Sequence, residues 1–129
     1  MEDTDNYSQS IKNNFFGTCN IAEVSSENNV SKFIFVSTDK AVRPTNLMGA
    51  SKRMAEIYLE SMSDKSKTLF SSVRFGNVID SSGSVVPTFR KQIKNGGPVT
   101  VTHPDIIRYF MTISEAAYLV ILASLITKE

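Results

Sequence analysis

Apolar residues recur at three- and four-residue steps in the first part of the chain, which predicts a helix over residues 8–26. The stripe that they form consists of Ile11, Phe15, Thr18, Cys19 and Ala22. A stripe of this kind is buried against the rest of a globular fold. The polar run at 27–29 (ENN) then ends the helix with residues typical of turns.

Two continuous apolar runs, at 32–38 (KFIFVST) and 69–75 (LFSSVRF), predict strands. The first run is rich in aromatic and β-branched residues, a pattern typical of strands that are covered on both faces in a parallel sheet. Between the two runs, apolar residues at helical spacing predict a helix over residues 47–62. The first half of the chain therefore indicates helix, strand, helix and strand in that order.

The second half contains a helix with clear signals at both ends. Ser84 is its predicted N-cap, and Pro87 falls in the first turn, where proline is tolerated. The run at 95–97 (NGG) provides a glycine stop. After it, valines alternate with threonine at 99–101, which predicts a short strand.

The last segments complete an alternating order of helices and strands. Residues 108–113 predict another strand, and Ser114 is the predicted cap of a final helix, with Glu115 suited to its positive end. The order favours an α/β fold with a parallel sheet. Because the first strand is already of the fully covered kind, we expect neighbouring strands upstream that this sequence does not contain.

Composition narrows the class of protein. Of 129 residues, 41% are hydrophobic and 21% are charged, which is ordinary for one globular domain. The net charge of +1 excludes the broad positive surface that drives non-specific nucleic-acid binding. The single cysteine excludes an internal disulfide, and no apolar stretch reaches the roughly 20 residues that cross a bilayer. We therefore expect a soluble, cytoplasmic chain with no nucleic-acid partner and no membrane segment.

Candidate chemistry is densest where the first predicted strand ends. Thr38, Asp39 and Lys40 place a hydroxyl, a carboxylate and an ammonium side by side, which are the groups that proton transfer requires. Ligands of open α/β sheets bind at this end of the strands. Met48 and Lys52 follow, one turn apart on the next helix. From spacing alone, the simpler interpretation is a solvated polar loop and a lysine on an exposed helix.

Longer segments resemble a known family. Residues 14–18 (NFFGT) resemble the N-x-x-G-T segment of extended short-chain dehydrogenases, in which the asparagine, here Asn14, helps to support the active site. Residues 37–52 (STDKAVRPTNLMGASK) resemble the active-site block of CapD-type polysaccharide biosynthesis proteins, which are membrane-associated UDP-N-acetylglucosamine 4,6-dehydratases of that family. The match continues through residues 73–78, 82–90 and 96–113.

The resemblance has implications for fold and origin. It implies the C-terminal portion of a Rossmann-like doubly wound parallel sheet that lacks its N-terminal strands. Residues 1–129 would then be a single partial domain, from a parent enzyme at the cytoplasmic face of the bacterial inner membrane. The parent would make capsule or other surface polysaccharides.

The resemblance also implies catalytic roles. Met48 stands where most of the superfamily has a tyrosine, and this substitution is typical of the membrane-associated dehydratases. Thr38 would stand near the sugar 4-hydroxyl. Asp39 would protonate the departing C6 hydroxyl, while Lys40 would remove the C5 hydrogen. A parent enzyme of this type would convert UDP-N-acetylglucosamine to a 4-keto-6-deoxy sugar.

The family's cofactor is NAD(P). By resemblance, Ser37, Lys52 and Phe75 would contact it, with Lys52 on the nicotinamide ribose. The Gly-rich loop G-x-G-x-x-G, which holds the pyrophosphate, does not occur in this sequence. We therefore expect that the chain alone does not bind the cofactor tightly.

The substrate implied by the resemblance is a UDP-sugar. Arginine forks match phosphate oxygens, and Asn77 and Arg108 correspond to positions that bind the diphosphate and ribose in the superfamily. For Arg90 and Arg74 the sequence leaves two alternatives, this binding role and an ordinary surface position. For Val85 the alternatives are contact with the uracil ring and packing within the helix. His103 has no neighbouring ligand cluster, so no metal site is expected.

Three functions stay open at this point. The first is a fragment of a nucleotide-sugar 4,6-dehydratase that is inactive alone. The second is another extended short-chain enzyme, such as a UDP-sugar 4-epimerase. The third is a truncated, non-catalytic domain that folds or acts only with a partner that supplies the missing strands. The open strand edge at 33–38 also leads us to expect self-association or a homo-oligomer.

Overall fold

The structure, a computed structural model, describes residues 4–79, 85–101 and 103–127. It divides the chain into two compact units, and each is described by itself. The first unit combines Met1–Arg74 with Leu119–Glu129, and the second is Phe75–Tyr118. The single partial domain expected from the sequence stays a prediction, and the predicted N-cap Ser84 lies outside the described residues.

The first unit begins with one continuous helical segment. Helix α1 (Thr4–Ile11) passes through a π-helical turn, η1 (Lys12–Phe16), into helix α2 (Gly17–Glu27). The predicted helix over 8–26 is therefore confirmed, with an earlier start. The π-helical turn contains Asn14. Single π-turns inside α-helices occur frequently at functional sites.

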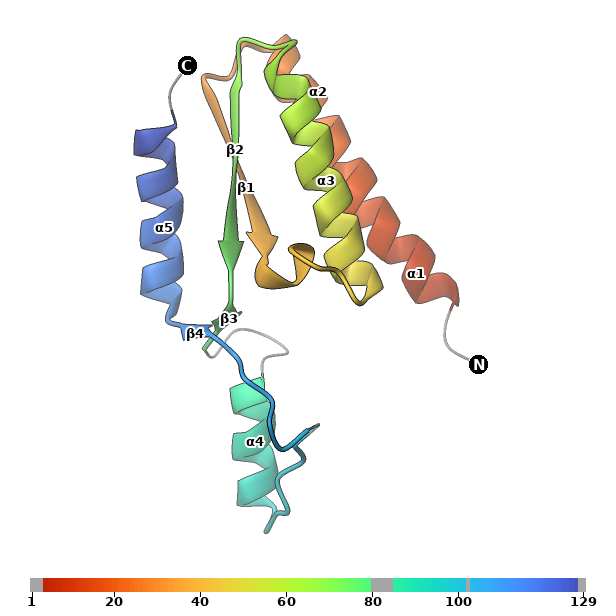
Figure 1. The fold of residues 1–129 in the computed structure, drawn as a ribbon, viewed down its shortest axis with the longest axis vertical. Coiled ribbons are helices and arrows are strands. Elements are labelled where there is room, and N and C mark those ends of the chain that lie inside the picture. The colour runs from red at the N-terminus through yellow and green to blue at the C-terminus, as the bar shows by residue number, and fades with distance from the viewer. Residues whose placement is uncertain (1–3, 80–84, 102, 128–129) are drawn as a thin grey trace. The chain divides into compact units, whose positions relative to one another are not determined.

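A two-stranded sheet forms the centre of the first unit. Strands β1 (Lys32–Thr38) and β2 (Leu69–Phe75) have the predicted bounds and run in the same direction in Figure 1. Helix α3 (Leu47–Ser63) connects them, as predicted. The α/β architecture with parallel strands is thus confirmed.

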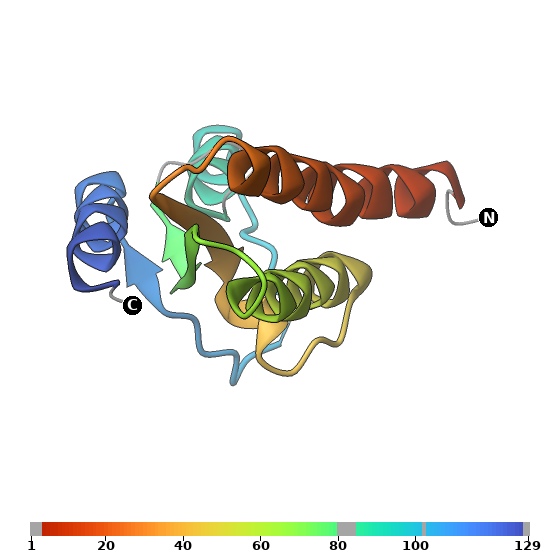
Figure 2. The ribbon, with the colours of Figure 1, turned by 90° about the horizontal axis from the view of Figure 1, so that it is seen from above.

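The sheet lies between helices. In Figures 1 and 2, α2 and α3 lie on the same side of β1 and β2, whereas the part of α5 in this unit, Leu119 onward, lies on the other side. The core between sheet, α2 and α3 consists of Ala22, Phe35, Ala55 and Leu59. The opposite face of β1 is more open, because Val36 is 42% exposed. The sequence predicts a strand that is covered on both faces, and Val36 departs from this prediction.

The second unit contains a shorter parallel pair. Strand β3 (Asn77–Val78) pairs with β4 (Phe110–Met111), and helix α4 (Val85–Lys94) lies between them in sequence. The predicted strand over 108–113 is thus reduced to two residues. A β-carbon at Gly76 would lie 2.7 Å from the carbonyl oxygen of Tyr109, so the approach of the two segments requires glycine.

Two predictions for the second unit hold. Pro87 lies in the first turn of α4, as expected. After the last residue of α4, Gly96 and Gly97 adopt φ angles of 93° and 72°, which strongly favour glycine. The Gly97 N–H donates to the carbonyl oxygen of Gln92 at 2.8 Å, which closes the end of the helix.

The predicted strand at 99–101 is wrong, since these residues form no strand. The amide side chain of Gln92 takes the place of a partner strand. It accepts from the Thr100 backbone N–H at 3.1 Å and donates to the Thr100 hydroxyl at 3.1 Å. A side chain on α4 therefore satisfies the backbone that a ladder would have used.

The cap of the last helix also differs from the prediction. Helix α5 spans Ile113–Ile126, so Ser114 lies inside it and the residue before it is Thr112. The Thr112 hydroxyl accepts from the Glu115 backbone N–H at 3.1 Å, and the Glu115 carboxylate accepts from the Thr112 backbone N–H at 2.6 Å. This reciprocal pair is a capping box. It confirms that Glu115 belongs at the positive end of the helix.

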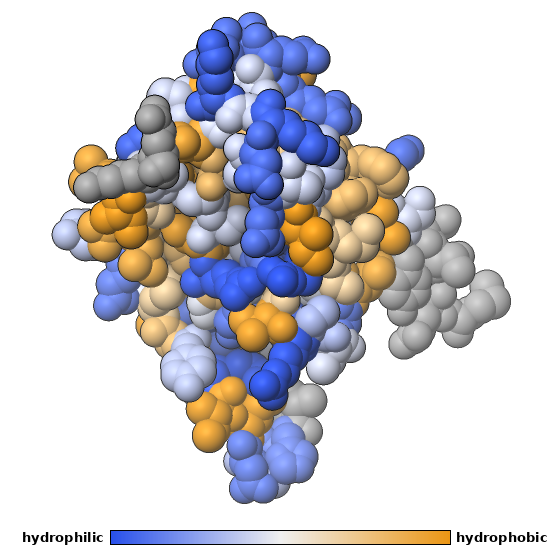
Figure 3. Space-filling model, turned by 45° about the horizontal axis from the view of Figure 1, so that its top comes forward, coloured by the Kyte–Doolittle hydropathy of each residue, from blue (hydrophilic) through white to orange (hydrophobic). Residues whose placement is uncertain are grey.

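Many apolar side chains reach the surface, as Figure 3 shows in orange for one face. Helix α5 is apolar nearly all round, and most of its large apolar side chains are exposed. Helices of this composition are normally covered in folded proteins. Within the part of the chain that the structure describes, none of the helices has the length and apolar character needed to span a membrane.

Candidate active site

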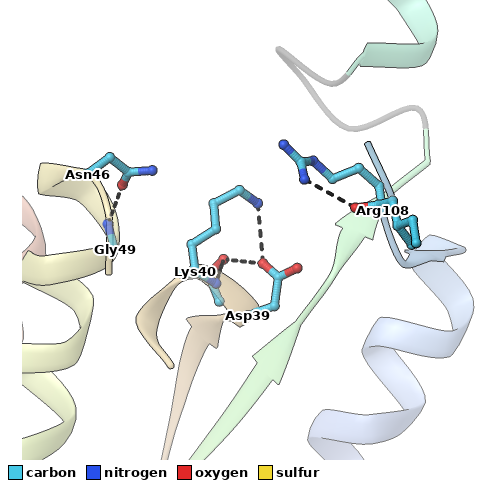
Figure 4. A network of polar contacts seen from close by, with 7 residues as sticks. Asp39, Lys40, Asn46, Gly49 and Arg108 are labelled. Atoms are coloured by element: carbon cyan, nitrogen blue, oxygen red, sulfur yellow. Dashed lines mark hydrogen bonds and ion pairs between the residues drawn. The ribbon is translucent and has the colours of Figure 1, made fainter. Parts of the chain in front are cut away.

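The carboxyl end of β1 carries a compact network of polar groups (Figure 4). The Thr38 hydroxyl donates to Oδ1 of Asp39 at 3.1 Å, and the Lys40 ammonium donates to the same oxygen at 3.2 Å. The backbone N–H of Lys40 donates to the Thr38 hydroxyl at 3.3 Å, so Thr38 caps the short helical turn η2 (Asp39–Ala41). The structure thus brings the three predicted residues into contact.

The charged side chains of the network are partly accessible. About a third of each charged side chain is accessible, 34% for Lys40 and 36% for Asp39. The fold therefore covers most of the pair and leaves part of each side chain accessible. A hydroxyl, a carboxylate and an ammonium in direct contact provide a donor and an acceptor at one place.

The first turn of α3 packs closely against the turn that carries this network. Asn46 caps the helix, because its side-chain oxygen accepts from the Gly49 backbone N–H at 2.8 Å (Figure 4). A β-carbon on Gly49 would lie 2.4 Å from the carbonyl oxygen of Lys40. Glycine therefore sets the distance between α3 and the turn η2. The sequence contains a signal for this close contact, because glycine is unfavourable inside a helix and usually has a structural reason there.

Lys52 reaches from α3 to β1. Its ammonium donates to the carbonyl oxygen of Val36 at 3.1 Å and lies 4.7 Å from the centroid of the Phe35 ring. Burial of the side chain lowers the pKa of Lys52. Met48, one turn earlier, is partly exposed and carries no group that can ionise. The predicted spacing of Met48 and Lys52 on one helix is confirmed.

Asn14 joins the first helical segment to the start of α3. Its amide donates to the Ser51 hydroxyl at 3.4 Å, and that hydroxyl donates to the carbonyl oxygen of Met48 at 3.0 Å. Ser51 is almost completely buried. The predicted supporting role of Asn14 stays a prediction, and its contacts connect it through Ser51 to the backbone of Met48.

The three predicted cofactor residues are divided between the two units. Ser37 and Lys52 lie in the first unit, whereas Phe75 belongs to the second. Ser37 is buried, and its hydroxyl lies near the carboxylate of Glu56, whose pKa is lowered mainly by Arg74 and less by Ser37. No hydrogen bond of good geometry to Ser37 Oγ occurs within the described residues. Ser37 therefore faces the interior of the unit.

A second polar cluster, which sequence reasoning missed, centres on Glu56 of α3. Arg74 donates to its carboxylate through Nε at 2.9 Å and Nη2 at 2.7 Å, and Arg53 donates through Nη1 at 2.9 Å. The Arg74 hydrogen bonds hold the pKa of Glu56 at about 2, against the opposing effect of burial. Arg74, open between two roles in the sequence, is thus a structural partner of Glu56.

The second unit contains a pocket of about 640 Å³. Its lining consists of Asn77, Val85, Phe89, Thr100, Val101, Ile106, Ile107, Arg108 and Phe110. Three of the four predicted substrate residues, Asn77, Val85 and Arg108, share this lining, and Arg90 is outside it. The Arg108 guanidinium donates to the carbonyl oxygen of Ile107 at 3.1 Å (Figure 4). The pocket combines apolar walls with an amide and a guanidinium.

Comparison with known proteins identifies a family and several relatives. Residues 2–129 match the family model described as polysaccharide biosynthesis protein. The capsular polysaccharide biosynthesis protein CapD of Staphylococcus aureus is 59% identical over 116 residues, which is 89% of this chain and 19% of CapD. A UDP-glucose 4-epimerase of Rickettsia bellii is 40% identical over 118 residues, 89% of this chain and 35% of the relative.

Solved structures agree with the fold. The structure of Pen from Bacillus thuringiensis superposes with a TM-score of 0.88 at 38% identity and covers 99% of this chain and 42% of Pen. A Thermus thermophilus UDP-glucose 4-epimerase in complex with NAD gives a TM-score of 0.75 at 25% identity, over 90% of this chain and 46% of the enzyme. The chain therefore corresponds to part of a Rossmann-type fold. It spans less than half the length of each of these proteins.

Proposed function

Because the chain belongs to the polysaccharide biosynthesis protein family, we propose that it carries the acid–base groups of a UDP-N-acetylglucosamine 4,6-dehydratase. The observation that supports this most is the contact of Thr38, Asp39 and Lys40 at the end of β1. Loss of water across C5 and C6 of a sugar needs one group that removes a proton and one that donates a proton. Inversion at C4 alone does not need this pair.

The proposed elimination requires a step that prepares the pair, and the hydrogen bond between Lys40 and Asp39 offers a path for it. At neutral pH a solvated lysine is protonated and an aspartate is ionised, which is the wrong state for elimination. Transfer of one proton along the 3.2 Å contact gives a neutral amine and a carboxylic acid. A substrate that covers the exposed side of the pair excludes water and favours this neutral form over two desolvated charges.

The proposed elimination then restores the resting state. Oxidation at C4 makes the C5 hydrogen acidic, and the neutral Lys40 amine removes it as a proton. The Asp39 carboxylic acid protonates the C6 hydroxyl, which leaves as water. Lys40 is again an ammonium and Asp39 a carboxylate, so protons balance. The Thr38 hydroxyl, which is hydrogen-bonded to Asp39, lies within the same network and is proposed to face the 4-hydroxyl.

The hydride chemistry of the reaction is supplied by NAD(P) when it is bound. In this chain Lys52 fits its ribose, because an ammonium has three N–H donors and one of them already holds the side chain on Val36. The fixed orientation leaves donors available for ribose hydroxyls. Ser37 fits less well, because its buried hydroxyl lies near Glu56.

The UDP part of the substrate is proposed to bind the pocket of the second unit. Its volume of about 640 Å³ is in the usual range for small-molecule sites. Arg108 offers a guanidinium for the diphosphate and Asn77 an amide for the ribose. Val85 and Phe89 provide an apolar wall on which a uracil ring can pack.

A UDP-sugar 4-epimerase is the second candidate, supported by the 40% identity to the Rickettsia bellii relative of that name. Met48 does not separate the two candidates, because both reactions begin with oxidation at C4 and lose the proton of the 4-hydroxyl, which a thioether cannot accept. The Asp39–Lys40 pair does separate them, because it has no task in an epimerisation. We therefore place the dehydratase first.

The test is a hybrid enzyme in which this chain replaces the aligned segment of the Staphylococcus aureus relative. The hybrid is incubated with UDP-N-acetylglucosamine and with UDP-glucose, and products are identified by NMR. A 4-keto-6-deoxy product supports the proposal. Formation of the C4 epimer without loss of water would show that the epimerase assignment is correct, and the unaltered relative serves as the control.

A further inference from the structure

Glu56 occupies an unusual place for a carboxylate. It lies in the middle of α3, is 5% exposed and belongs to the helix that also carries Met48 and Lys52. Carboxylates are seldom buried to this extent unless they are paired. The fork of Arg74 and the single contact of Arg53 provide three charge-assisted hydrogen bonds. Glu56 is therefore a fully engaged group and not a surface residue.

Two residues near the Glu56 carboxylate lie on the two strands that lead to the candidate site. Arg74 is the penultimate residue of β2, and Ser37, which lies near the carboxylate, directly precedes Thr38 on β1. One turn earlier on α3, Lys52 makes the second connection, through the carbonyl oxygen of Val36. Helix α3 is thus attached to β1 by the hydrogen bond of Lys52 and to β2 by the pair of Glu56 and Arg74.

Glu56 does not take part in proton transfer. With a pKa of about 2 it is ionised throughout the neutral range, and its oxygens are occupied by the arginine donors. Its effect on chemistry is therefore geometric. A shift of about 1 Å in a reacting group is enough to lower a rate substantially, so the attachment of α3 to β1 matters for both Lys52 and the Thr38 network.

We propose that Glu56 is a positioning residue: through Arg74 it holds α3 in register with β2, the partner strand of β1, so that Lys52 and the Thr38–Asp39–Lys40 network keep a fixed relation. The catalytic meaning of this fixed relation rests on the proposed function. The fixed relation itself is a property of the folded chain and is testable without substrate or cofactor.

The experiment measures two reactivities in the 129-residue chain. The acetylation rate of Lys52, followed by mass spectrometry, reports whether its ammonium leaves Val36. The thiol reactivity of Cys19, which is buried and the only cysteine, reports opening of the core. In Glu56→Gln we expect Lys52 to react roughly tenfold faster, the size expected for loss of a charge-assisted hydrogen bond, with Cys19 unchanged.

Two further variants complete the design. Glu60→Gln removes a carboxylate one turn further along α3 and should leave both rates unchanged. Arg74→Lys keeps the Glu56 charge but cannot form the fork, so it separates geometry from electrostatics and should also accelerate Lys52. If Glu56→Gln unfolds, which full exposure of Cys19 would show, Arg74→Lys carries the test.

The outcomes are decisive in each case. Faster labelling of Lys52 with a protected Cys19 supports the positioning role. Parallel acceleration at both residues in Arg74→Lys means that the cluster only stabilises the fold, which overturns the proposal. Unchanged Lys52 labelling in both cluster variants also overturns it. None of these results depends on whether the enzyme is a dehydratase or an epimerase.

Discussion

Gly49 lies so close to Lys40 that a β-carbon on the glycine would stand 2.4 Å from the lysine carbonyl oxygen. The contact joins the first turn of α3 to the turn that follows β1. Two segments that carry candidate catalytic residues are therefore separated by a distance that only glycine permits. The backbone, and not a side chain, sets this part of the site.

The contact predicts an unusual response to alanine. Inside a helix, Gly→Ala normally stabilises a protein by up to about 1 kcal/mol. At Gly49 the added methyl group meets backbone that cannot rotate away, so we expect a loss of about 1–3 kcal/mol in the free energy of unfolding. Urea unfolding monitored by circular dichroism measures it.

Gly17→Ala is the matched control. Gly17 is helical, and its β-carbon would meet the Lys12 carbonyl oxygen at 3.6 Å, an ordinary contact. This variant should be as stable as the unaltered chain or more so. Equal effects at Gly17 and Gly49 would contradict the tight contact at Lys40.

Glu56 predicts a specific pH dependence of stability. Its pKa falls from 4.5 to about 2 on folding, so its contribution is fully present above 4.5 and is lost as the pH falls toward 2. We expect this contribution to be about 1–3 kcal/mol, because the arginine partners are partly exposed. Urea unfolding at pH 7 and pH 3 measures it.

The control is Glu56→Gln, which cannot titrate. Its free energy of unfolding should fall less between pH 7 and pH 3 than that of the unaltered chain. The same slope in both proteins would mean that the Arg74 pair contributes nothing, which disagrees with the 2.7 Å contact.

The predictability of the fold follows from how local each signal is. The strands at Lys32–Thr38 and Leu69–Phe75 were predicted with correct bounds, because each is a continuous apolar run between polar segments. The strand expected at 99–101 fails because Gln92, eight residues from Thr100, satisfies its backbone. Alternation alone cannot reveal a competing side chain.

The same distinction between local and long-range signals applies to the candidate site. Thr38, Asp39 and Lys40 are adjacent in sequence, so their contact was predictable from the end of one strand. Glu56 and Arg74 are 18 residues apart on different elements, and nothing in their spacing indicates an ion pair. Long-range pairs of this kind depend on how α3 packs on the sheet, which the sequence does not state locally.

The pocket of the second unit predicts a difference between two arginines. Arg108 lines it and Arg90 does not. If UDP binds there, Arg108→Ala should weaken UDP binding about ten- to a hundredfold, as expected for loss of a charge-assisted contact to phosphate. Calorimetric titration with UDP measures it, and Arg90→Ala is the control. Equal losses in the two variants would place the diphosphate elsewhere.

The exposed apolar surface predicts association of the chain. Within the described residues, strand β1 has a partner strand, β2, along one edge, and its other edge has none. Leu125 and Ile126 of α5 are exposed. Apolar surface of this kind recruits partners. Sedimentation velocity should show mass that rises with concentration, and Leu125→Lys should reduce it, whereas Lys67→Glu should not. A monomer at all concentrations would contradict this prediction.

The most direct test of the proposed chemistry is exchange of the C5 hydrogen. In the hybrid enzyme with UDP-N-acetylglucosamine and NAD+ in deuterated water, the unaltered sequence should incorporate deuterium at C5, since Lys40 removes that proton. Lys40→Ala should lower this exchange on the order of a hundred- to ten-thousandfold, the usual effect of losing a general base. Near-normal exchange in Lys40→Ala would show that another group removes the proton and that the role proposed for the Asp39–Lys40 pair is wrong.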